Sequence, residues 1–391
     1  MGRIGIYGGA FNPPHIGHIQ AAQYGLKAMQ LDRLLMIPSC DSPHKALPEN
    51  SPDAKQRLEM LSLAIGQAEK IQVSDIEICR GGTSYTYQTV AQLREIYPNE
   101  ELVLFMGTDM FLSFLSWREP ERILKDASIA VFYRGEREER ENISRQKMLL
   151  ASMGATVYTV ENPVIEVSST DLRRMLIFGC AGKYLPKPVR DYIESNKLYG
   201  TGQNLKGLSL EQLEQWVISL LKPNRVSHVL GCRDTAVELA KLWGADETDA
   251  ARAALLHDIT KALDGEHQLT TCREYGIILD NFSQENPKTL HALTGSLVAE
   301  RIFGESEAVV KAIASHTTGK ENMNVLEKII YVADYMEPNR DFPGVEKLRK
   351  LAYTDLDEAM KLGLTMTLDM LKRQGREISL KSLDALAYLN R

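Results

Sequence analysis

The chain has 391 residues, of which 44 % are hydrophobic and 25 % charged, with a formal net charge of −6 at pH 7 and a pI near 5.9. This composition provides enough apolar residues for more than one core, and its acidic balance excludes a strongly basic nucleic-acid-binding protein. The five cysteines show no C-x-x-C spacing, and neither a signal peptide nor an apolar run of membrane-spanning length is present, so we expect a cytoplasmic protein without disulfides or membrane contact.

The first half alternates strand-like runs with helical stretches. A helix is predicted over 16–29, and Ser51-Pro52-Asp53 is expected to open another, with a cap residue followed by proline at the first helical position. Because this alternation implies parallel pairing, we predict an α/β fold with a doubly wound, Rossmann-like parallel sheet, whose ligands lie beyond the carboxyl ends of its strands. The predicted strands are 4–7, 34–37, 71–78, 102–106, 129–133 and 156–160.

The alternation stops near Leu198, where residues 199–207 contain three glycines and are typical of a linker. Ser209 and Gln212 form a sequence capping box that is expected to open a helix. Helical periodicity continues from there, for example at 235–242, 249–256, 293–302 and 325–336, without a convincing strand. We therefore predict one domain over 1–199, a linker over 200–208 and an all-α domain over 209–391.

The first strand leads into the sequence G-G-A-F-N-P-P-H-I-G-H at residues 8–18. Gly8 and Gly9 let the backbone approach a ligand closely, and a helix that begins at or just before His15 attracts phosphate through its N-terminal N–H groups. His15 and His18 are three residues apart and lie on one helical face, so both rings can address the same anion. A pair of structural histidines is the less favoured interpretation of so dense a motif.

This loop, with Phe11 at its centre, resembles that of the HxGH nucleotidyltransferase superfamily, which includes class I aminoacyl-tRNA synthetases and small adenylyltransferases. The chain lacks a Lys-Met-Ser-Lys-Ser sequence, and a first half of this size leaves little room for tRNA binding. Ser168-Ser169-Thr170-Asp171-Leu172-Arg173 instead matches the Ser-Ser-Thr-x-x-Arg signature of the small adenylyltransferases. At a helix N-terminus its hydroxyl groups and Arg173 can hold triphosphate oxygens.

Further segments resemble those of bacterial nicotinate-mononucleotide adenylyltransferases over residues 1–199: S-P-H-K at 42–45, G-T-S-Y-T at 82–86, G-T-D at 107–109 and W-R at 117–118. The resemblance implies that AMP passes from ATP, which carries Mg²⁺, to nicotinate mononucleotide, with release of pyrophosphate. Nicotinamide mononucleotide and phosphopantetheine remain alternative acceptors.

The same resemblance assigns residues to three roles. The catalytic residues are His15, His18, Lys45 and Arg173. The nicotinate mononucleotide is bound by Lys45, Thr86, Trp117 and Arg118. The ATP side is formed by Gly8, Gly9, Phe11, His15, His18, Gly107, Asp109, Ser168, Ser169, Thr170 and Arg173.

Five of the eight histidines follow the linker. The order His228, His257-Asp258, His291, His316, Asp334 resembles the ligand order of metal-dependent HD phosphohydrolases, and His267 lies outside this pattern. Imidazole and carboxylate donors suit first-row ions such as Fe or Mn. Six donors fit two ions bridged by Asp258, whereas with one ion His291 and His316 would be free to bind substrate phosphate.

Three segments, L-H-D-I-T-K at 256–261, H-T-T-G at 316–319 and A-D-Y-M-E-P-N-R at 333–340, resemble the bacterial HD-type symmetrical diadenosine tetraphosphate hydrolases, over about residues 205–385. The resemblance implies cleavage of diadenosine tetraphosphate into two ADP, with Asp258 and Lys261 catalytic and Lys261 and Arg340 on the substrate. A nucleotide-sensing or dimerising HD domain without turnover is the alternative. The expected partners are small nucleotides and no nucleic acid, and a homo-oligomer remains open.

Overall fold

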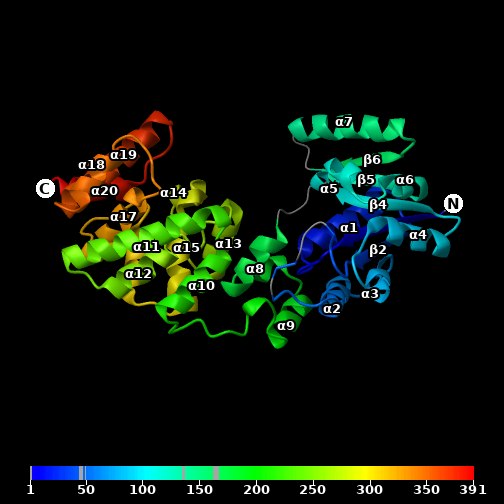
Figure 1. Ribbon diagram of the computed structural model, residues 1–391, viewed down its shortest axis with the longest axis horizontal. Coiled ribbons are helices and arrows are strands. Elements are labelled where there is room, and N and C mark those ends of the chain that lie inside the picture. The colour runs from blue at the N-terminus through cyan, green and yellow to red at the C-terminus, as the bar shows by residue number, and fades with distance from the viewer. Residues whose placement is uncertain (1, 44–46, 49, 134–136, 162–166) are drawn as a thin grey trace. The chain divides into compact units, whose positions relative to one another are not determined.

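The computed structural model describes residues 2–43, 47–48, 50–133, 137–161 and 167–391, and its chain forms two compact units. The first unit comprises residues 1–176 and 181–202, and the second comprises 177–180 and 203–391. Their elements are labelled in Figure 1. Within the described ranges, every helix is too short or too polar to cross a membrane.

The first unit is built on a parallel sheet, which confirms the predicted fold class. Its described part contains six strands in the order β3-β2-β1-β4-β5-β6. Since β1 pairs with β2 on one side and with β4 on the other, the strand order reverses there, and the crevice at the carboxyl ends of these strands is where such sheets bind ligands. The strands are β1 (Arg3–Gly9), β2 (Arg33–Pro38), β3 (Ile71–Val73), β4 (Glu101–Gly107), β5 (Ser128–Tyr133) and β6 (Val157–Glu161).

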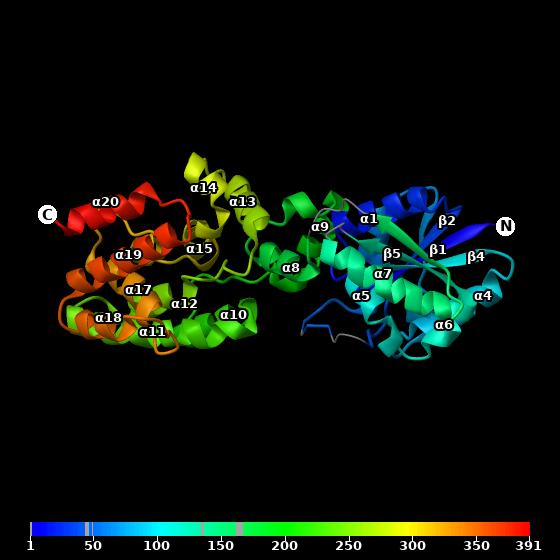
Figure 2. The same ribbon diagram turned by 90° about the horizontal axis from the view of Figure 1, so that it is seen from above.

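Both faces of the sheet are buried, which explains why its strands are nearly continuous apolar runs. In β4, Leu104 and Met106 belong to the core cluster beneath α4, α6 and α7, while Val103 and Phe105 belong to the cluster beneath α1 and α2. Figure 2 shows these helices from a second direction. The helices of this unit are α1 (Ile16–Ala28), α2 (Ala54–Ile65), α3 (Ile76–Arg80), α4 (Thr86–Ile96), α5 (Thr108–Leu112), α6 (Pro120–Asp126), α7 (Arg137–Ser152), α8 (Ser169–Ile177, whose last residue groups with the second unit) and α9 (Lys187–Ser195).

Two predicted elements are wrong in extent. The predicted strand 71–78 ends at Val73, because the edge strand β3 pairs only with β2 and the chain then enters α3 at Ile76. The helix expected to open at Ser51 begins at Ala54. Asp53 and Gln56 form the capping box, so the helix starts after the proline rather than with it.

The second unit is helical throughout residues 203–391, all of which are described, and the predicted capping box of Ser209 and Gln212 is confirmed. Helix α11 packs along α12 and α17, and α16 contacts α12, α15 and α17. The helices are α10 (Leu210–Leu220), α11 (Pro223–Trp243), α12 (Glu247–Leu256), α13 (Gly265–Glu274), α14 (Asn281–Glu285), α15 (His291–Val298), α16 (Glu307–Ser315), α17 (Val325–Met336), α18 (Val345–Ala352), α19 (Leu356–Arg373) and α20 (Leu380–Leu389).

Gly25 sets the distance between α1 and the sheet. A Cβ at this position would lie 2.3 Å from Phe105 Cε2 and 2.8 Å from Phe132 Cζ. The two rings are themselves packed, with centroids 4.6 Å apart. Because α1 begins beside His15, this close approach also fixes where that end of the helix lies relative to the strands.

We therefore expect Gly25→Ala to destabilise the protein, although alanine is the better helix former. The added methyl group must displace two core rings, at a cost of about 1–3 kcal/mol that exceeds the gain of about 1 kcal/mol in helix propensity. The measurement is the free energy of unfolding from hydrogen exchange of β4 amides in the full-length protein. Gln23→Ala, on the exposed side of α1, is the control and should be neutral. Equal stability of the two variants would contradict the packing role of Gly25.

Candidate active sites

The loop after β1 is shaped for a ligand that approaches the backbone. Gly8 is exposed, and a Cβ built on it would meet nothing within 4 Å, so the space beside it is open. Phe11 turns the chain with a φ of +45°, and its buried ring packs edge-on against Tyr7 and His18. His15 then occupies the N-cap position of α1.

His15 and His18 form one stacked pair, with ring centroids 3.7 Å apart. The main-chain N–H of His15 donates to Nδ1 of His18 at 3.3 Å, so a neutral His18 carries its proton on Nε2. Burial lowers the pKa of His15 to about 4 and that of His18 well below its ordinary value. Both rings are therefore neutral near pH 7, so toward an anion they can serve only as N–H donors and not as cations.

A buried arginine joins this loop to the next one. Arg57 of α2 is 1 % exposed, and its guanidinium donates to the carbonyl of Ala10 at 2.8 Å. It also donates to the carbonyls of Ser39 and Cys40 at 2.7 and 2.9 Å. Because charged groups are rarely buried without partners, this arginine holds the loops after β1 and β2 in one fixed arrangement.

Asn12 connects the loop to the end of the unit. Its carbonyl accepts from Nη1 of Arg173 at 2.8 Å, and its side-chain oxygen accepts from the hydroxyl of Tyr199 at 2.7 Å. Its amide nitrogen donates to Ser51 Oγ at 2.9 Å. The structure thus brings the predicted Arg173 to the histidine loop. The sequence analysis missed Arg57 and Tyr199 as site residues. Their partners are 17 to 187 positions away in the sequence, so no local spacing identifies them.

The Ser-Ser-Thr segment lies at the N-terminus of α8. Ser168 Oγ accepts from the main-chain N–H of Asp171 at 3.0 Å, and Thr170 Oγ1 accepts from Arg173 Nη2 at 3.1 Å. Ser169 is the first residue of the helix. Hydroxyl groups and main-chain N–H groups therefore gather at one helix end, an arrangement that suits phosphate oxygens.

Three of the four residues predicted to bind the acceptor line one cavity. Thr86, Trp117 and Arg118 surround a volume of about 320 Å³, together with Pro43, Tyr85 and Ser116. The guanidinium of Arg118 lies over the Tyr85 ring, 4.7 Å from its centroid, and fixes that wall. Gly107 and Asp109 are exposed at the carboxyl end of β4. Lys45 lies outside the described residues.

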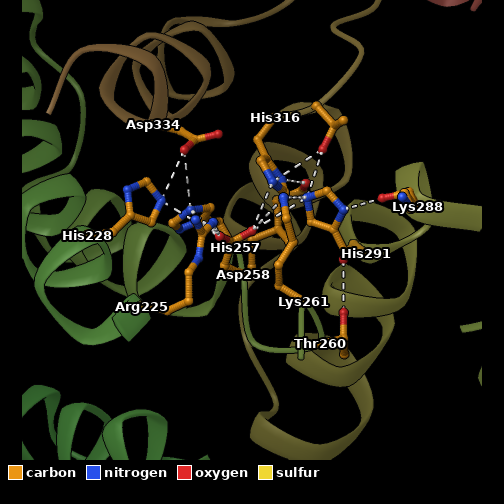
Figure 3. A network of polar contacts seen from close by, with 12 residues as sticks. Arg225, His228, His257, Asp258, Thr260, Lys261, Lys288, His291, His316 and Asp334 are labelled. Carbon is orange, nitrogen blue, oxygen red and sulfur yellow. Dashed lines mark hydrogen bonds and ion pairs between the residues drawn. The ribbon is translucent and has the colours of Figure 1, made fainter. Parts of the chain in front are cut away.

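In the second unit, five different helices or their ends each bring a predicted metal ligand to one point, as Figure 3 shows. The ligands are His228 in α11, His257 and Asp258 directly after α12, His291 at the start of α15, His316 directly after α16, and Asp334 in α17. His267, left outside the pattern, is on α13 and pairs with Asp264 at 3.0 Å.

Asp258 lies between two pairs of histidines. Its Oδ2 atom is 3.7 Å from Nε2 of His228 and 3.6 Å from Nε2 of His257. Its Oδ1 atom is 3.4 Å from Nε2 of His291 and 3.8 Å from Nε2 of His316. Asp334 adds an oxygen on the first side only, 3.2 Å from His228 and 3.8 Å from His257.

This donor set fits divalent metal, which the HD domain implies. The Nε2 atoms of His228 and His257 are buried and find no hydrogen-bond partner among the described residues. Burial lowers the pKa of His257 to about 4, so its imidazole is neutral, as a ligand must be. Burial opposes ionisation of Asp258 and Asp334, but the neighbouring histidines and cations hold the pKa of both carboxyls well below the usual range. Neutral nitrogens facing carboxylate oxygens leave a place for a cation between them.

Three cations border the donor set. The side chains of Lys261 and Arg340 are 39 % and 34 % exposed, whereas Asp258 is 1 % exposed. Lys261 lies 3.5 Å from Asp258, and Arg340 lies 2.6 Å from Asp334. Arg225, which the sequence analysis missed, forms an ion pair with Asp258 and is 27 % exposed. Its position three residues before His228 on α11 is the signal that could have identified it.

Comparison with known proteins divides the chain in the same way. Residues 6–175 match the cytidylyltransferase-like family, and residues 225–339 match the HD domain. A probable nicotinate-nucleotide adenylyltransferase of Borreliella burgdorferi is 34 % identical over 198 residues, which cover 50 % of this chain and 96 % of that protein. A symmetrical bis(5'-nucleosyl)-tetraphosphatase of Halalkalibacterium halodurans is 42 % identical over 171 residues, 41 % of this chain and 88 % of that protein.

A solved structure from Clostridium acetobutylicum, described as a predicted HD superfamily hydrolase involved in NAD metabolism, is 38 % identical. The match covers 47 % of this chain and 97 % of that one, with a TM-score of 0.46.

The lowered pKa of His15 predicts a loss of stability in mild acid. Between the ordinary pKa near 6.5 and the native value of about 4, the unfolded state binds a proton that the native state does not, so stability falls as the pH drops through this window. We expect this residue to account for about 2 kcal/mol between pH 7 and pH 5. Hydrogen exchange of β1 amides in wild-type protein and in His15→Gln measures it. An equal loss in both proteins would show that His15 does not titrate in this way.

The bond between Tyr199 and Asn12 predicts coupling across the unit. Tyr199→Phe leaves the buried Asn12 oxygen without its donor and should lower the free energy of unfolding by about 1–3 kcal/mol. It should also lower kcat/KM for ATP, because the histidine loop loses a hydrogen bond that holds it in place. A double-mutant cycle with Asn12→Ala should give a coupling energy of about 1 kcal/mol. Tyr24→Phe, at a 39 % exposed residue, is the control. Additive effects of the two variants would exclude the coupling.

Proposed function

Since the chain belongs to the nicotinate-nucleotide adenylyltransferase family through its first half and to the symmetrical bis(5'-nucleosyl)-tetraphosphatase family through its second, we propose that it is a bifunctional nucleotide enzyme. The first unit transfers AMP from ATP to nicotinate mononucleotide and releases pyrophosphate. The second hydrolyses diadenosine tetraphosphate to two ADP. The observation that carries this proposal is the presence of two separate polar sites among the described residues, one in each unit.

In the transfer reaction, an oxygen of the mononucleotide phosphate attacks the α-phosphorus of ATP as the bond to pyrophosphate breaks. No covalent enzyme intermediate is needed, so the protein acts by positioning and by stabilising charge. His18 donates its Nε2–H to phosphate oxygens, and the stacked His15 holds that ring in place. Arg173 and the hydroxyl groups of Ser168, Ser169 and Thr170 bind the triphosphate with the Mg²⁺ that ATP carries, and Lys45 binds the phosphate of the mononucleotide.

The cavity beside Trp117 is the proposed acceptor site. Its volume of about 320 Å³ suits one heteroaromatic ring with part of its ribose, not a dinucleotide. The indole offers a stacking face, and Thr86 lies at the N-terminus of α4, where N–H groups favour a carboxylate over an uncharged amide. This supports nicotinate rather than nicotinamide mononucleotide.

In the hydrolytic site the six predicted ligands, with Asp258 between the two pairs of histidines, would hold one or two Fe or Mn ions. Such ions supply Lewis-acid activation of water and of phosphate oxygens. Water adds to a phosphorus at the centre of the tetraphosphate, the central P–O–P bridge breaks, and each half leaves as ADP. Lys261, Arg340 and Arg225 are the half-exposed cations that can hold the polyphosphate.

A non-catalytic, nucleotide-sensing HD domain would need only binding. Six donors around one point and three cations at its rim support turnover instead, because binding alone requires no ordered ligand set. The two activities are separable by experiment, since each has its own residues.

The test is a reciprocal pair of variants of the full-length protein. His18→Ala should lower kcat for adenylyl transfer about a hundredfold, as expected for the loss of one preorganised donor, and should leave hydrolysis unchanged. Asp258→Ala should abolish hydrolysis of diadenosine tetraphosphate with Mn²⁺ or Fe²⁺ and leave adenylyl transfer unchanged. Products are resolved by chromatography, with ADP expected as the sole product of hydrolysis.

Each arm can fail by itself. Near-normal kcat in His18→Ala would refute the role of that histidine. Wild-type protein that binds the dinucleotide but does not turn it over with any added metal would make the second unit a sensing module and leave the first activity standing.

A further inference from the structure

The four ligand histidines of the second unit differ in what holds the ring nitrogen that faces away from the site. In three of them Nδ1 contacts the main-chain carbonyl three residues earlier. A carbonyl only accepts, so Nδ1 carries the proton and Nε2 turns its lone pair toward the site. The three contacts are His257 with Ala254 at 2.6 Å, His316 with Ile313 at 2.7 Å, and His291 with Lys288 at 2.9 Å.

His228 cannot use this arrangement. The other three lie at helix ends or just beyond them, where carbonyl groups lack an i+4 N–H partner, whereas His228 is inside α11 and the carbonyls of that turn accept helical N–H groups. Its Nδ1 instead lies 3.1 Å from Oε1 of Glu337, a carboxylate that is 1 % exposed. Glu337 follows directly after α17, three residues beyond the ligand Asp334.

Glu337 is itself held in place from two sides. Its Oε2 atom accepts from the main-chain N–H and from the side-chain amide of Asn339, both at 2.8 Å. The same amide donates to the carbonyl of Ser227 at 3.1 Å, next to His228. On α11, a Cβ at Gly231 would lie 2.5 Å from Glu337 Oε2, so only glycine leaves room for the carboxylate against that helix.

From this geometry we infer that Glu337 is a positioning residue for the metal centre, which acts through His228. It keeps the proton of His228 on Nδ1, aims Nε2 at the site and strengthens that nitrogen as a donor through its negative charge. Gly231 leaves the space that the Glu337 carboxylate occupies, and Asn339 donates two hydrogen bonds to it. The inference rests on the proposed metal-dependent function and adds residues that the ligand order does not contain.

The effect of Glu337 is confined to one side of Asp258. His228 shares that side with His257 and Asp334, while His291 and His316 face the other oxygen with their own carbonyl contacts. Loss of Glu337 therefore weakens metal binding on the His228 side of Asp258 and leaves His291 and His316 in place.

The test is titration of metal-free, full-length protein with Mn²⁺, with free Mn²⁺ followed by electron paramagnetic resonance. Glu337→Ala should raise the dissociation constant of one Mn²⁺ position about 10- to 100-fold, the usual effect of losing such a partner. Glu337→Gln keeps an acceptor oxygen but no charge and should give a smaller change. Gly231→Ala, which displaces the carboxylate without removing it, should shift affinity in the same direction as Glu337→Ala.

Glu307→Gln is the matched control, since this glutamate is 81 % exposed and pairs with Lys311 in the first turns of α16, at the opposite end of that helix from His316. A second readout is the ¹⁵N spectrum of histidine-labelled protein, in which Glu337→Ala should alter the tautomer of His228 alone. A structural defect would disturb all four rings.

Mn²⁺ affinity in Glu337→Ala and Gly231→Ala equal to that of wild-type protein would overturn the inference and leave the metal centre standing. Wild-type protein that binds no Mn²⁺, Fe²⁺ or other divalent ion would reject the metal centre itself and the role of Glu337 with it. Adenylyl transfer should be unchanged in every variant, and this confirms that the first unit is folded.

Discussion

The second unit is organised around a carboxylate taken out of water. Asp258 is 1 % exposed at the meeting point of five helical segments, and a buried charge is tolerated only when other charges or hydrogen-bond donors surround it. Its two oxygens face two different histidine pairs, and lysine and arginine side chains approach from the rim. The histidine rings and the bordering cations gather around this one group because a buried carboxylate needs such partners.

The first unit also has buried polar groups that need hydrogen-bond partners, but the group at its centre is uncharged. Its polar centre is Asn12, whose carbonyl, side-chain oxygen and amide nitrogen each have a partner from a different part of the unit. The buried Arg57 in turn satisfies three main-chain carbonyls that two loops would otherwise leave without donors. The parallel sheet places these loops at the carboxyl ends of its strands. The hydrogen bonds of Asn12 and Arg57 then fix the position of the histidine pair at that edge.

Much of the fold could be predicted from local pattern. The apolar runs of β1, β2, β4, β5 and β6, the helix after His15 and the capping box at Ser209 each depend on a few consecutive residues, so the sequence identifies them. The two errors have different origins. The apolar run 71–78 leaves the sheet after Val73 although β2 continues to Pro38, and α3 follows at Ile76, which no local pattern determines. The helix cap is local, because Asp53 and not Ser51 has a glutamine three residues on.

By itself the sequence determined the residue types and the short spacings that bear the chemistry: paired histidines one helical turn apart, a hydroxyl-rich helix start, and an ordered set of histidines and aspartates. The first two are set within one element, by the helical repeat or by a helix end, and the third is an order of residues along the chain. Only the tertiary structure decided which single residues complete the sites. Arg57 and Tyr199 belong to no motif of regular spacing. Arg225 and Glu337 each lie three residues from a predicted ligand, but their partners, Asp258 and His228, come from other elements. Their roles come from contacts between segments up to 187 positions apart, and such contacts exist only once the helices and strands have packed.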